Sequence, residues 1–508
     1  MKSILPFLVG NGLSLIVPAP STRAEHPDLV PLDEPEDRDS IVRDRYMIAL
    51  EEHAQLSDHW EAIGQDLSKD SDACGDYRYL ANIKVYFCTI KDKNPPDERV
   101  RGDTDNVHSV AVDATFPLED DFEDAQPVDE SIIKRWDRAR RPGPWYLQQM
   151  AARGKLPPSG PGDIPVDHMK NPLPGEGVNI YILDSGINRQ HNAFYSGPNF
   201  RLPHRVVNFM GLGMKINICI ALFSDLMKLK NDTWGHGTAV ASVAASWRYG
   251  IAPGATVVNV KVAPTDSGMH FEGLTQAIAI DTIVEEHKQN AEKVPRPRIS
   301  GSEFKGSVIS ISGRVQEWPG VERALRIAYE NGIPIAASAG NLNTNVDDLR
   351  NKYPCAYDQV TCVGSSDHAY KRFTQSESKG SNYGMAINVF APDSSIRAAH
   401  FQVPTGSVMG EGTSYSTAFV AGMMATILSY EGFESFDYAE GIYERVQANF
   451  LNGVLEDIPE GTQNAFLTTG INHVNRLETC PYAGLTNDQC IAINNGEEKG
   501  DEDDEKES

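Results

Sequence analysis

Three short stretches of the chain carry a carboxylate, an imidazole and a hydroxyl in settings where they could do chemistry. Asp184 follows the apolar run VNIYIL, His236 stands between two glycines in GHGTAVAS, and Ser414 follows Gly and Thr in GTSYSTAFVAG. These groups can make a serine nucleophile, the base that takes its proton and the acid that orients the base. Their occurrence in one chain, in the order Asp, His, Ser, predicts nucleophilic catalysis.

Each stretch by itself has an ordinary structural interpretation. Asp184 followed by Ser and Gly is common turn chemistry, a lone His236 is usually a core or surface residue, and Ser414 is equally well explained as a helix N-cap. The combination favours catalysis. Flanking glycines are expected to leave the His236 ring uncovered, and the apolar helix after Ser414 begins with backbone NH groups that favour developing negative charge.

Apolar strands and helical segments alternate from about residue 175, and this pattern predicts the scaffold. The helical stretches include 272–288 and 320–330, so right-handed βαβ crossovers and an α/β fold follow. In such a sheet the ligand site lies outside the carboxyl ends of the strands, where Asp184 is expected. The near-continuous apolar runs typical of strands buried on both faces are VNIYIL, TVVNVKV, SVISIS, IPIAAS and QVTCVG.

A second, smaller unit precedes this scaffold. RYMIALEE, ANIKVYFCTI and SVAVDATF read as strands, and residues 54–66 read as a helix, which together predict a small α+β module. The module is followed by an acidic run and then by the basic residues Arg138, Arg140 and Arg141. Such a polar, exposed joint is where proteolytic cleavage concentrates.

Composition and the chain ends limit the partners and the compartment. The 508 residues include 71 Asp plus Glu against 46 Lys plus Arg, a net charge of −25 that disfavours nucleic acid and anionic membranes as partners. Residues 1–22 combine Lys2, an apolar stretch and small residues, as in a signal peptide, the alternative being a buried N-terminal strand or helix. Because no later run is long enough for a membrane helix, a secreted, extracellular protein is expected.

Seven cysteines fit an oxidising compartment. Three locally spaced pairs are conceivable, but the sequence leaves the connectivity open, and none of the spacings resembles a zinc site. One cysteine, Cys219, is left over. The conceivable pairs are Cys74 with Cys88, Cys355 with Cys362 and Cys480 with Cys490.

Taken together, the motifs resemble those of the subtilases, the subtilisin-like serine endopeptidases. ILDSGIN, GHGTAVAS and GTSYSTAFVAG are similar to the family's Asp, His and Ser signatures, in the same order. IPIAASAGN resembles the segment that carries the family's oxyanion asparagine, here Asn341, whose alternative interpretation is a turn residue after Gly340. SNYG and VFAPD are further matches, and the resemblance extends over residues 142–475.

The resemblance implies a mainly parallel sheet with helices on both faces and a role for each site residue. Ser414 would attack the scissile carbonyl, His236 would take and return its proton, and Asp184 would hold the imidazole. The Asn341 amide and the Ser414 backbone NH would form the oxyanion hole. The chemistry requires no cofactor, while structural calcium is common in the family and has no assignable ligands here. Protein or peptide substrates are implied, with a monomer as the default.

The family also suggests how the chain is organised. The module at residues 40–120 resembles an inhibitor-type prosegment, which assists folding and then blocks the enzyme until it is cut away, here between about residues 117 and 143. GPWYLQQM at 143–150 resembles the start of the mature enzyme. The expected organisation is a signal peptide at 1–22, this prosegment, a catalytic domain at 142–475 and a disordered acidic tail at 476–508, with an interaction tail as the alternative.

Several stretches depart from the family pattern. Thr417, Ala418 and Phe419 replace the usual small residue, Pro and His. Arg314 and Val315 replace glycines that usually line the substrate cleft, so bulk and charge there would reshape the pocket for the residue before the scissile bond. Residues 211–230 read as a lineage-specific loop or as translated intron. The sequon NDT at 231–233 adjoins the His motif, and we expect it to carry no glycan.

Two functions other than an endopeptidase are compatible with parts of the sequence. Arg314, Val315 and the insert would suit a catalytically silent subtilase-like protein that binds peptides or partners, but such a protein would not need all four site residues. A lipase or esterase of the α/β-hydrolase type is disfavoured because Ser414 is not within Gly-x-Ser-x-Gly and because its triad order would be Ser, Asp, His.

Overall fold

The computed structural model describes two connected units and the segments that position the site. The predicted signal peptide, the insert at 211–230, the joint at 118–143, Cys219, Cys480, Cys490 and the acidic tail lie outside the described residues. The described residues are 29–35, 40–90, 96–117, 144–152, 154–155, 174–194, 206–208, 232–263, 270–293, 298–299, 302–315, 317–349, 352–435 and 439–469.

The larger unit is built on a nine-stranded sheet, in the order β20-β21-β17-β14-β13-β12-β6-β8-β7. Neighbouring strands are parallel throughout except β20 and β21, which are antiparallel, so the predicted α/β fold with a mainly parallel sheet is confirmed. All five predicted apolar runs lie on this sheet. Its strands are β6 (Val178–Asp184), β7 (Val206–Asn208), β8 (Thr256–Lys261), β12 (Gly306–Ile311), β13 (Ile335–Ser338), β14 (Thr361–Ser366), β17 (Val389–Pro392), β20 (Leu451–Asn452) and β21 (Ala465–Phe466).

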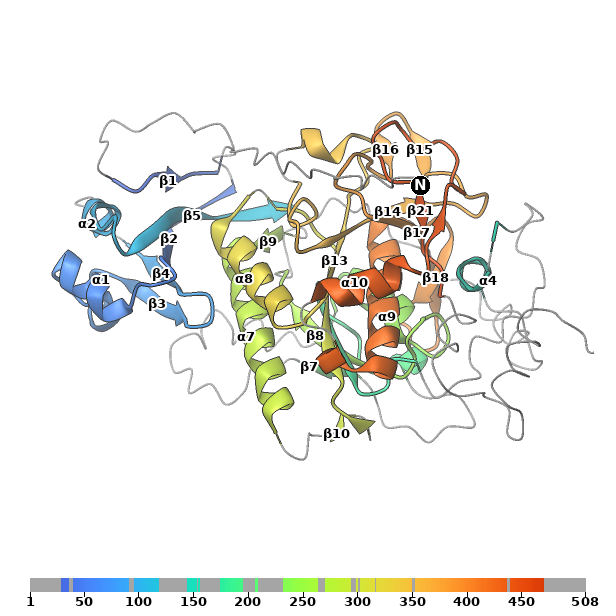
Figure 1. Ribbon diagram of the computed structural model, residues 1–508, viewed down its shortest axis with the longest axis horizontal. Helices are drawn as coiled ribbons and strands as arrows, with labels where there is room; N and C mark the ends of the chain where they lie inside the picture. The colour runs from blue at the N-terminus through green and yellow to red at the C-terminus, as the bar shows by residue number, and fades with distance from the viewer. Residues whose placement is uncertain are drawn as a thin grey trace, which may run out of the picture.

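Helices cover both faces of this sheet (Figure 1). The helices α6 (His236–Ala245) and α9 (Thr413–Glu431) share one apolar core with strand residues such as Ile180 and Ile182. The helices α7 (Gly273–Glu292) and α8 (Pro319–Glu330) share the opposite core with Tyr181 and Leu183, which alternate along the same strand. The sequence prediction of these two helices, at 272–288 and 320–330, is confirmed.

The helix α9 has no solvent face over most of its length, as its sequence predicts. Its residues from Thr413 to Ser429 are all buried. A β-carbon on Gly422 would lie 2.7 Å from the Ala244 carbonyl oxygen, so this glycine lets α9 pack closely against α6. The two helices that begin with Thr413 and His236 are therefore held at a fixed spacing.

The smaller unit is an α+β module, as predicted, and it also contains β1, β3 and α2, which were not predicted. Its sheet has the order β1-β5-β2-β4-β3, and β9 of the larger unit is added to it beside β5. The elements are β1 (Leu32–Asp33), β2 (Ile41–Leu50), α1 (Leu56–Ile63), β3 (Gly75–Leu80), β4 (Val85–Thr89), α2 (Pro96–Gly102), β5 (Val107–Pro117) and β9 (His270–Glu272).

Shorter elements complete the two units. They are the helices α4 (Trp145–Ala151) and α10 (Ala439–Gln447), the 3-10 turns η2 (Leu67–Lys69), η3 (Asn192–Phe194), η4 (Val346–Asp348) and η5 (Phe433–Ser435), and the strands β10 (Arg298–Ile299), β11 (Ser302–Glu303), β15 (Thr374–Ser376), β16 (Lys379–Gly380), β18 (Ile396–Ala399) and β19 (Ser407–Gly410). None of the helices in the described part of the chain is long and apolar enough to cross a bilayer.

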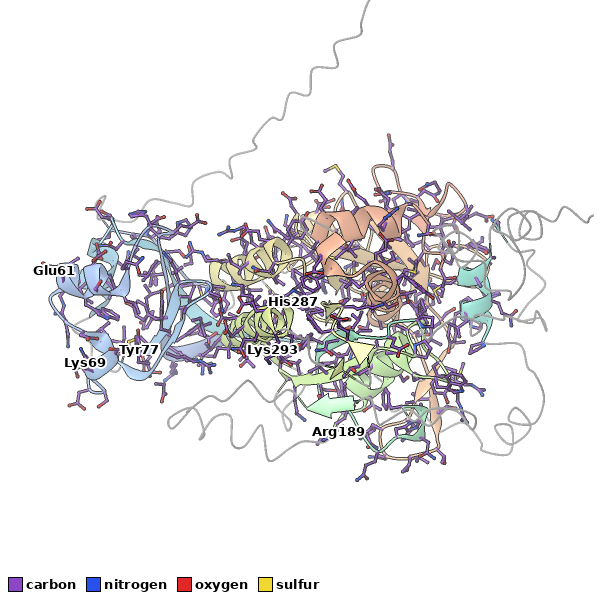
Figure 2. The ribbon with its side chains drawn as sticks, turned by 60° about the horizontal axis from the view of Figure 1, so that its bottom comes forward. Glu61, Lys69, Tyr77, Arg189, His287 and Lys293 are labelled. Carbon is purple, nitrogen blue, oxygen red and sulfur yellow. A yellow bond between two sulfur atoms is a disulfide. The ribbon has the colours of Figure 1, made fainter. Side chains whose placement is uncertain are left out.

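The module packs on α7 and α8 through its own sheet, as Figures 1 and 2 show. In Figure 2, Tyr77 marks the module, His287 marks α7 and Lys293 is the residue that follows α7. Met47 and Phe87 of the module belong to the same apolar core as Trp318 at the start of α8. A buried ion pair at 2.5 Å joins Arg45 to Asp113, and Asp113 also accepts a bond from the Leu274 backbone NH at 3.3 Å. The contact therefore combines apolar packing with buried, partnered polar groups.

Two disulfides are present, Cys74–Cys88 in the module and Cys355–Cys362 beside the central sheet. Two of the three pairs that the sequence left open are thereby confirmed.

Candidate active site

Asp184 is the last residue of β6 and lies at the carboxyl edge of the sheet, as predicted. Every residue of β6 is buried, and the strand lies between β12 and β8. The Asp184 side chain is 1% exposed and its Oδ1 accepts a bond from the Ser185 backbone NH at 2.6 Å. The carboxylate is therefore fixed by the strand behind it and the turn after it.

His236 is the first residue of α6 and faces Asp184. Its Nδ1 lies 2.9 Å from both carboxylate oxygens. Gly235 has φ 106°, which favours glycine, and a β-carbon on Gly237 would lie 2.9 Å from Asp184 Oδ1 and overlap the Gly186 carbonyl. In the full chain the His236 ring is only 1% exposed, so the expectation that its glycines leave it uncovered is wrong. They instead allow the backbone to bring the ring to Asp184.

Asp232 fixes the turn that presents His236, a role that the sequence analysis missed. One of its oxygens accepts bonds from the backbone NH groups of Trp234 (3.0 Å) and Gly235 (2.7 Å) and from the Ser185 hydroxyl (2.9 Å). The other accepts from Thr238, through both its backbone NH and its hydroxyl. An Asp four residues before a glycine-flanked His at a helix start is the pattern that could have revealed it.

Ser414 is the second residue of α9 and is not its N-cap. The cap position belongs to Gly412, with φ 120° and ψ 157°, and no side chain caps the helix. The alternative interpretation of Ser414 as an N-cap is therefore wrong. The next residue, Tyr415, packs its ring edge-on against His236, with 6.5 Å between ring centroids. The starts of α6 and α9 thus converge, and the residue after Ser414 lies against the imidazole that contacts Asp184.

Asn341 lies three residues beyond the end of β13, which is separated from β6 by β12. Its Oδ1 accepts bonds from the Thr413 backbone NH at 2.9 Å and the Thr413 hydroxyl at 3.1 Å. Its Nδ2 therefore lies at the opposite end of the amide, where a β-carbon on Gly412 would be 3.1 Å away. This amide is held as an oriented donor next to the start of α9.

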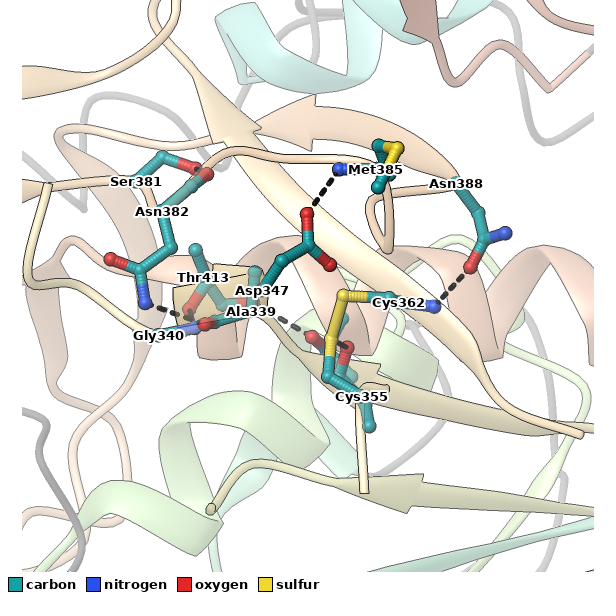
Figure 3. The surroundings of a disulfide bond; sticks show 12 residues. Ala339, Gly340, Asp347, Cys355, Cys362, Ser381, Asn382, Met385, Asn388 and Thr413 are labelled. Carbon is teal, nitrogen blue, oxygen red and sulfur yellow. Dashed lines mark hydrogen bonds between the residues drawn. A yellow bond between two sulfur atoms is a disulfide. The ribbon is translucent and has the colours of Figure 1, made fainter. Parts of the chain in front are cut away.

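The surroundings of Asn341 are braced by further contacts (Figure 3). The Gly340 backbone NH donates to the Thr413 hydroxyl at 3.1 Å, and Asn382 Nδ2 donates to the Ala339 carbonyl at 2.8 Å. The Cys355–Cys362 disulfide ties the loop after Pro354 to β14, the strand next to β13. The strand end that carries Asn341 is therefore held on both sides.

A buried carboxylate, Asp393, anchors the residues just before Ser414. It follows β17 and accepts bonds from the Gly412 backbone NH at 2.6 Å, the Ser365 hydroxyl at 2.7 Å and the Ser394 backbone NH. Desolvation by complete burial raises the pKa of Asp393 to about 6, and these bonds oppose the rise. The stretch VFAPD indicated only a resemblance to the family, and nothing in it predicted this contact.

The described residues contain no group of three or more His, Cys, Asp or Glu side chains placed to hold a metal ion. The suggestion of structural calcium stays a prediction, because oxygen ligands for calcium can also come from backbone carbonyls.

The comparisons with known proteins agree with the motifs. A model of the subtilase family matches residues 175–439, more than half of the chain. Subtilisin-like serine protease AsES of Sarocladium strictum is 27% identical over 88% of this chain and 95% of its own. Subtilisin-like protease 3 of Saccharomyces cerevisiae is 26% identical over 64% of this chain, which spans 61% of that relative's length.

A solved structure, of a cold adapted subtilisin-like serine proteinase, is also similar, at 22% identity and a TM-score of 0.48 over 64% of this chain and 98% of that one. The family match and the protease relatives support a peptidase function. By these matches, the chain belongs to the subtilase family.

Proposed function

We propose that the protein is a secreted serine endopeptidase, made as a zymogen, that hydrolyses peptide bonds through Asp184, His236 and Ser414. The observation that carries the proposal is the contact of His236 Nδ1 with both oxygens of Asp184 while the same ring packs against the residue after Ser414. An oriented imidazole next to a serine at a helix start is the arrangement that activates a hydroxyl nucleophile.

The proposal gives each group a role. With Nδ1–H donating to Asp184, the unprotonated Nε2 of His236 accepts the Ser414 proton as the hydroxyl attacks the scissile carbonyl. The same nitrogen then gives the proton to the leaving amine, while Asp184 stabilises the imidazolium. The Asn341 amide and the Ser414 backbone NH donate to the oxyanion. Losing one such donor typically raises the barrier by about 2.7–4 kcal/mol.

The module at residues 40–120 is proposed as an intramolecular inhibitor. Its last strand, β5, pairs antiparallel with β9, with Thr115 opposite Glu272 and Pro117 opposite His270. Ala114 of the same strand packs with Val315, in the loop after β12. The end of β5 therefore lies beside β9 and the loop after β12, and that loop follows the carboxyl end of a sheet strand. In helix α4, the Tyr146 hydroxyl donates to the Arg397 carbonyl at 2.8 Å, so this helix is bonded to the larger unit. The bond supports a mature enzyme that begins near residue 143.

Covalent labelling tests the endopeptidase. Purified protein treated with a fluorophosphonate should carry the label on Ser414 and should hydrolyse casein in preference to a short acyl ester. An unlabelled protein that hydrolyses neither substrate would support the silent peptide-binding alternative. Preference for the acyl ester would support an esterase.

Maturation tests the zymogen. If processing is autocatalytic, the Ser414→Ala protein should accumulate uncut, while the wild type is cut between about residues 117 and 143. Processing of the Ser414→Ala protein at Arg138, Arg140 or Arg141 would assign the cut to a separate basic-specific protease. N-terminal sequencing of both secreted proteins distinguishes these results. An active enzyme that begins upstream of residue 100 would contradict the prosegment.

A further inference from the structure

A buried cation lies between the two strand ends that carry site residues. Arg314 is three residues beyond the end of β12, and β12 lies between β6, which ends at Asp184, and β13, which leads to Asn341. These strands are parallel, so their carboxyl ends share one edge of the sheet. Arg314 is therefore within the same row of strand ends as the candidate triad acid and the oxyanion amide.

The Arg314 side chain extends toward Asn341. A β-carbon on Gly340 would lie 2.6 Å from Arg314 Nε and 2.8 Å from its Cζ, so the guanidinium occupies the space beside the peptide that leads to Asn341. Arg314 is 2% exposed, and desolvation lowers its pKa to about 10. The side chain is still a cation at neutral pH.

The approach of β5 shows which side of the scissile bond faces Arg314. Ala114 packs with Val315, the residue after Arg314, and β5 then continues antiparallel to β9. Ala114 comes before the last three residues of β5, which pair with β9. β5 therefore passes the Arg314 loop before the chain reaches the stretch after Phe116, where we expect the zymogen to be cut. A chain bound in this direction places residues N-terminal to the scissile bond beside Arg314.

The nearest of those residues is the one that supplies the scissile carbonyl. The Asn341 amide would bind the carbonyl oxygen of this residue. The side chain of the same residue branches from the Cα that is bonded to the carbonyl carbon. Because Arg314 adjoins Gly340, the residue before Asn341, this side chain is the one in reach of the guanidinium. A guanidinium fork matches a carboxylate in two hydrogen bonds, so an acidic side chain is the one that this cation is shaped to bind.

We propose that Arg314 binds the side-chain carboxylate of the residue immediately before the scissile bond, so that the enzyme cleaves after Asp or Glu. The proposal rests on the endopeptidase function proposed above. The chain's own sequence agrees with it, because β5 is followed by LEDDFED, with five acidic residues between positions 118 and 124. This run contains the bonds that we expect the zymogen to cut first.

Matched peptides test the preference. In an otherwise constant fluorogenic peptide, the residue before the scissile bond is varied as Asp, Asn, Glu, Gln and Leu, and kcat/KM is measured with the secreted wild-type protein. The Asp and Glu peptides should be cleaved at least about 100-fold faster than their isosteric Asn and Gln partners, because a site built for a charged group rejects the analogue that lacks it. Asp and Asn differ little in shape, so this ratio isolates charge.

Three variants locate the preference at one side chain. Arg314→Gln should reduce the Asp/Asn and Glu/Gln ratios to within about 10-fold of one, and Arg314→Lys should retain a preference for the acids. Arg445→Gln removes the same charge at an exposed position whose partner is Glu431 at 3.0 Å, and its ratios should equal those of the wild type. Active-site titration with the fluorophosphonate corrects each rate for the fraction of folded enzyme.

Each outcome decides between the two proposals. An active wild type without an acidic preference overturns the inference and leaves the endopeptidase standing, and this result needs no variant to fold. An acidic preference that persists in Arg314→Gln also overturns it. A wild type that cleaves no peptide and takes up no fluorophosphonate overturns the endopeptidase and the inference together.

Discussion

Two histidines of this molecule contact a carboxylate through Nδ1 in the protein interior, but their second ring nitrogens have different surroundings. In the module, His59 Nδ1 lies 2.6 Å from Asp103, and its Nε2 lies 2.9 Å from the Tyr86 hydroxyl. In the larger unit, His236 contacts Asp184 and packs beside Tyr415 at the start of α9. A buried His–Asp pair is therefore not enough to make a candidate active site. The surroundings of the second ring nitrogen decide whether the histidine can serve as a catalytic base.

The surroundings of His59 explain why we assign it a structural role. Its ring is fully buried and packs against Trp60 and Tyr86 at centroid distances of 4.9 and 5.6 Å. Desolvation lowers the pKa of His59, although the hydrogen bond and charge of Asp103 oppose this. A neutral imidazole that bridges a carboxylate and a phenol joins α1 to the sheet behind it. No serine or backbone donor group of a helix start adjoins it among the contacts of the described residues.

The largest effect is expected at Ser414. Ser414→Ala should lower kcat by about 10⁶-fold, because it removes the nucleophile of a group that acts as a unit. Since Gly412 is the N-cap, the free energy of unfolding should change by about 1 kcal/mol or less. Hydrolysis of casein and thermal unfolding measure the two quantities. Full activity in this variant would remove Ser414 from the site.

The two aspartates should respond differently to the same substitution. Asp184→Asn should lower kcat on the order of 10⁴-fold, because the amide no longer holds the imidazole in the required tautomer. Asp103→Asn should leave kcat unchanged per fluorophosphonate-reactive molecule, because Asp103 and its partner His59 belong to the module that we propose is cut away before the enzyme acts. Equal losses in both variants would mean that the module's pair takes part in catalysis, contrary to the comparison.

His59→Leu should lower the free energy of unfolding of the module and should not lower the catalytic rate. The change leaves the Asp103 carboxylate and the buried Tyr86 hydroxyl without this partner, at a cost of about 2–4 kcal/mol. Denaturant unfolding of the Ser414→Ala background, which is expected to remain uncut, measures it. His287→Leu is the matched control, because His287 is buried against Phe304 and Phe433 and its Nδ1 makes no hydrogen bond. Its cost should be smaller.

The smallest effect is a pH dependence of the module's stability. Because the folded-state pKa of His59 is lowered below 6.5, the unfolded chain binds its proton more readily. The contribution of His59 is therefore complete above pH 6.5 and is lost as pH falls toward its folded pKa, with a slope of up to about 1.4 kcal/mol per pH unit. The free energy of unfolding is measured between pH 7.5 and 5 for the wild-type and His59→Leu proteins, both in the Ser414→Ala background. The difference between the two should be largest at neutral pH and should shrink in acid. Parallel curves would contradict this linkage.

The sequence predicted much of the fold because the deciding patterns are local. Apolar runs such as VNIYIL can be buried on both faces only within a parallel sheet that helices cover, and α9 is apolar all round because it is buried all round. Asp184, His236, Ser414 and Asn341 could be named in advance because each follows directly on the strand or begins the helix that positions it. Short elements such as α2, β3 and β9 were missed, since each contains too few residues to show a clear periodicity.

Other features depended on contacts between distant segments. Asp232 and Asp393 act on the site through backbone groups that only the folded chain brings to them, and their own sequence surroundings are ordinary turns. The cap at Gly412 and the burial of His236 were likewise fixed by packing. For this reason the alternative interpretation of Ser414 as an N-cap and the expectation of an uncovered His236 ring were wrong.

Residue types and their order along the chain determined the family, the sheet and the candidate catalytic group. The tertiary structure alone decided which buried His–Asp pair packs against the start of α9, and it placed Arg314 beside Gly340. The physical reason is that hydrogen bonding, desolvation and electrostatic interaction act over a few ångströms in space. Sequence separation does not report those distances when the partners are 44, 52 or more residues apart.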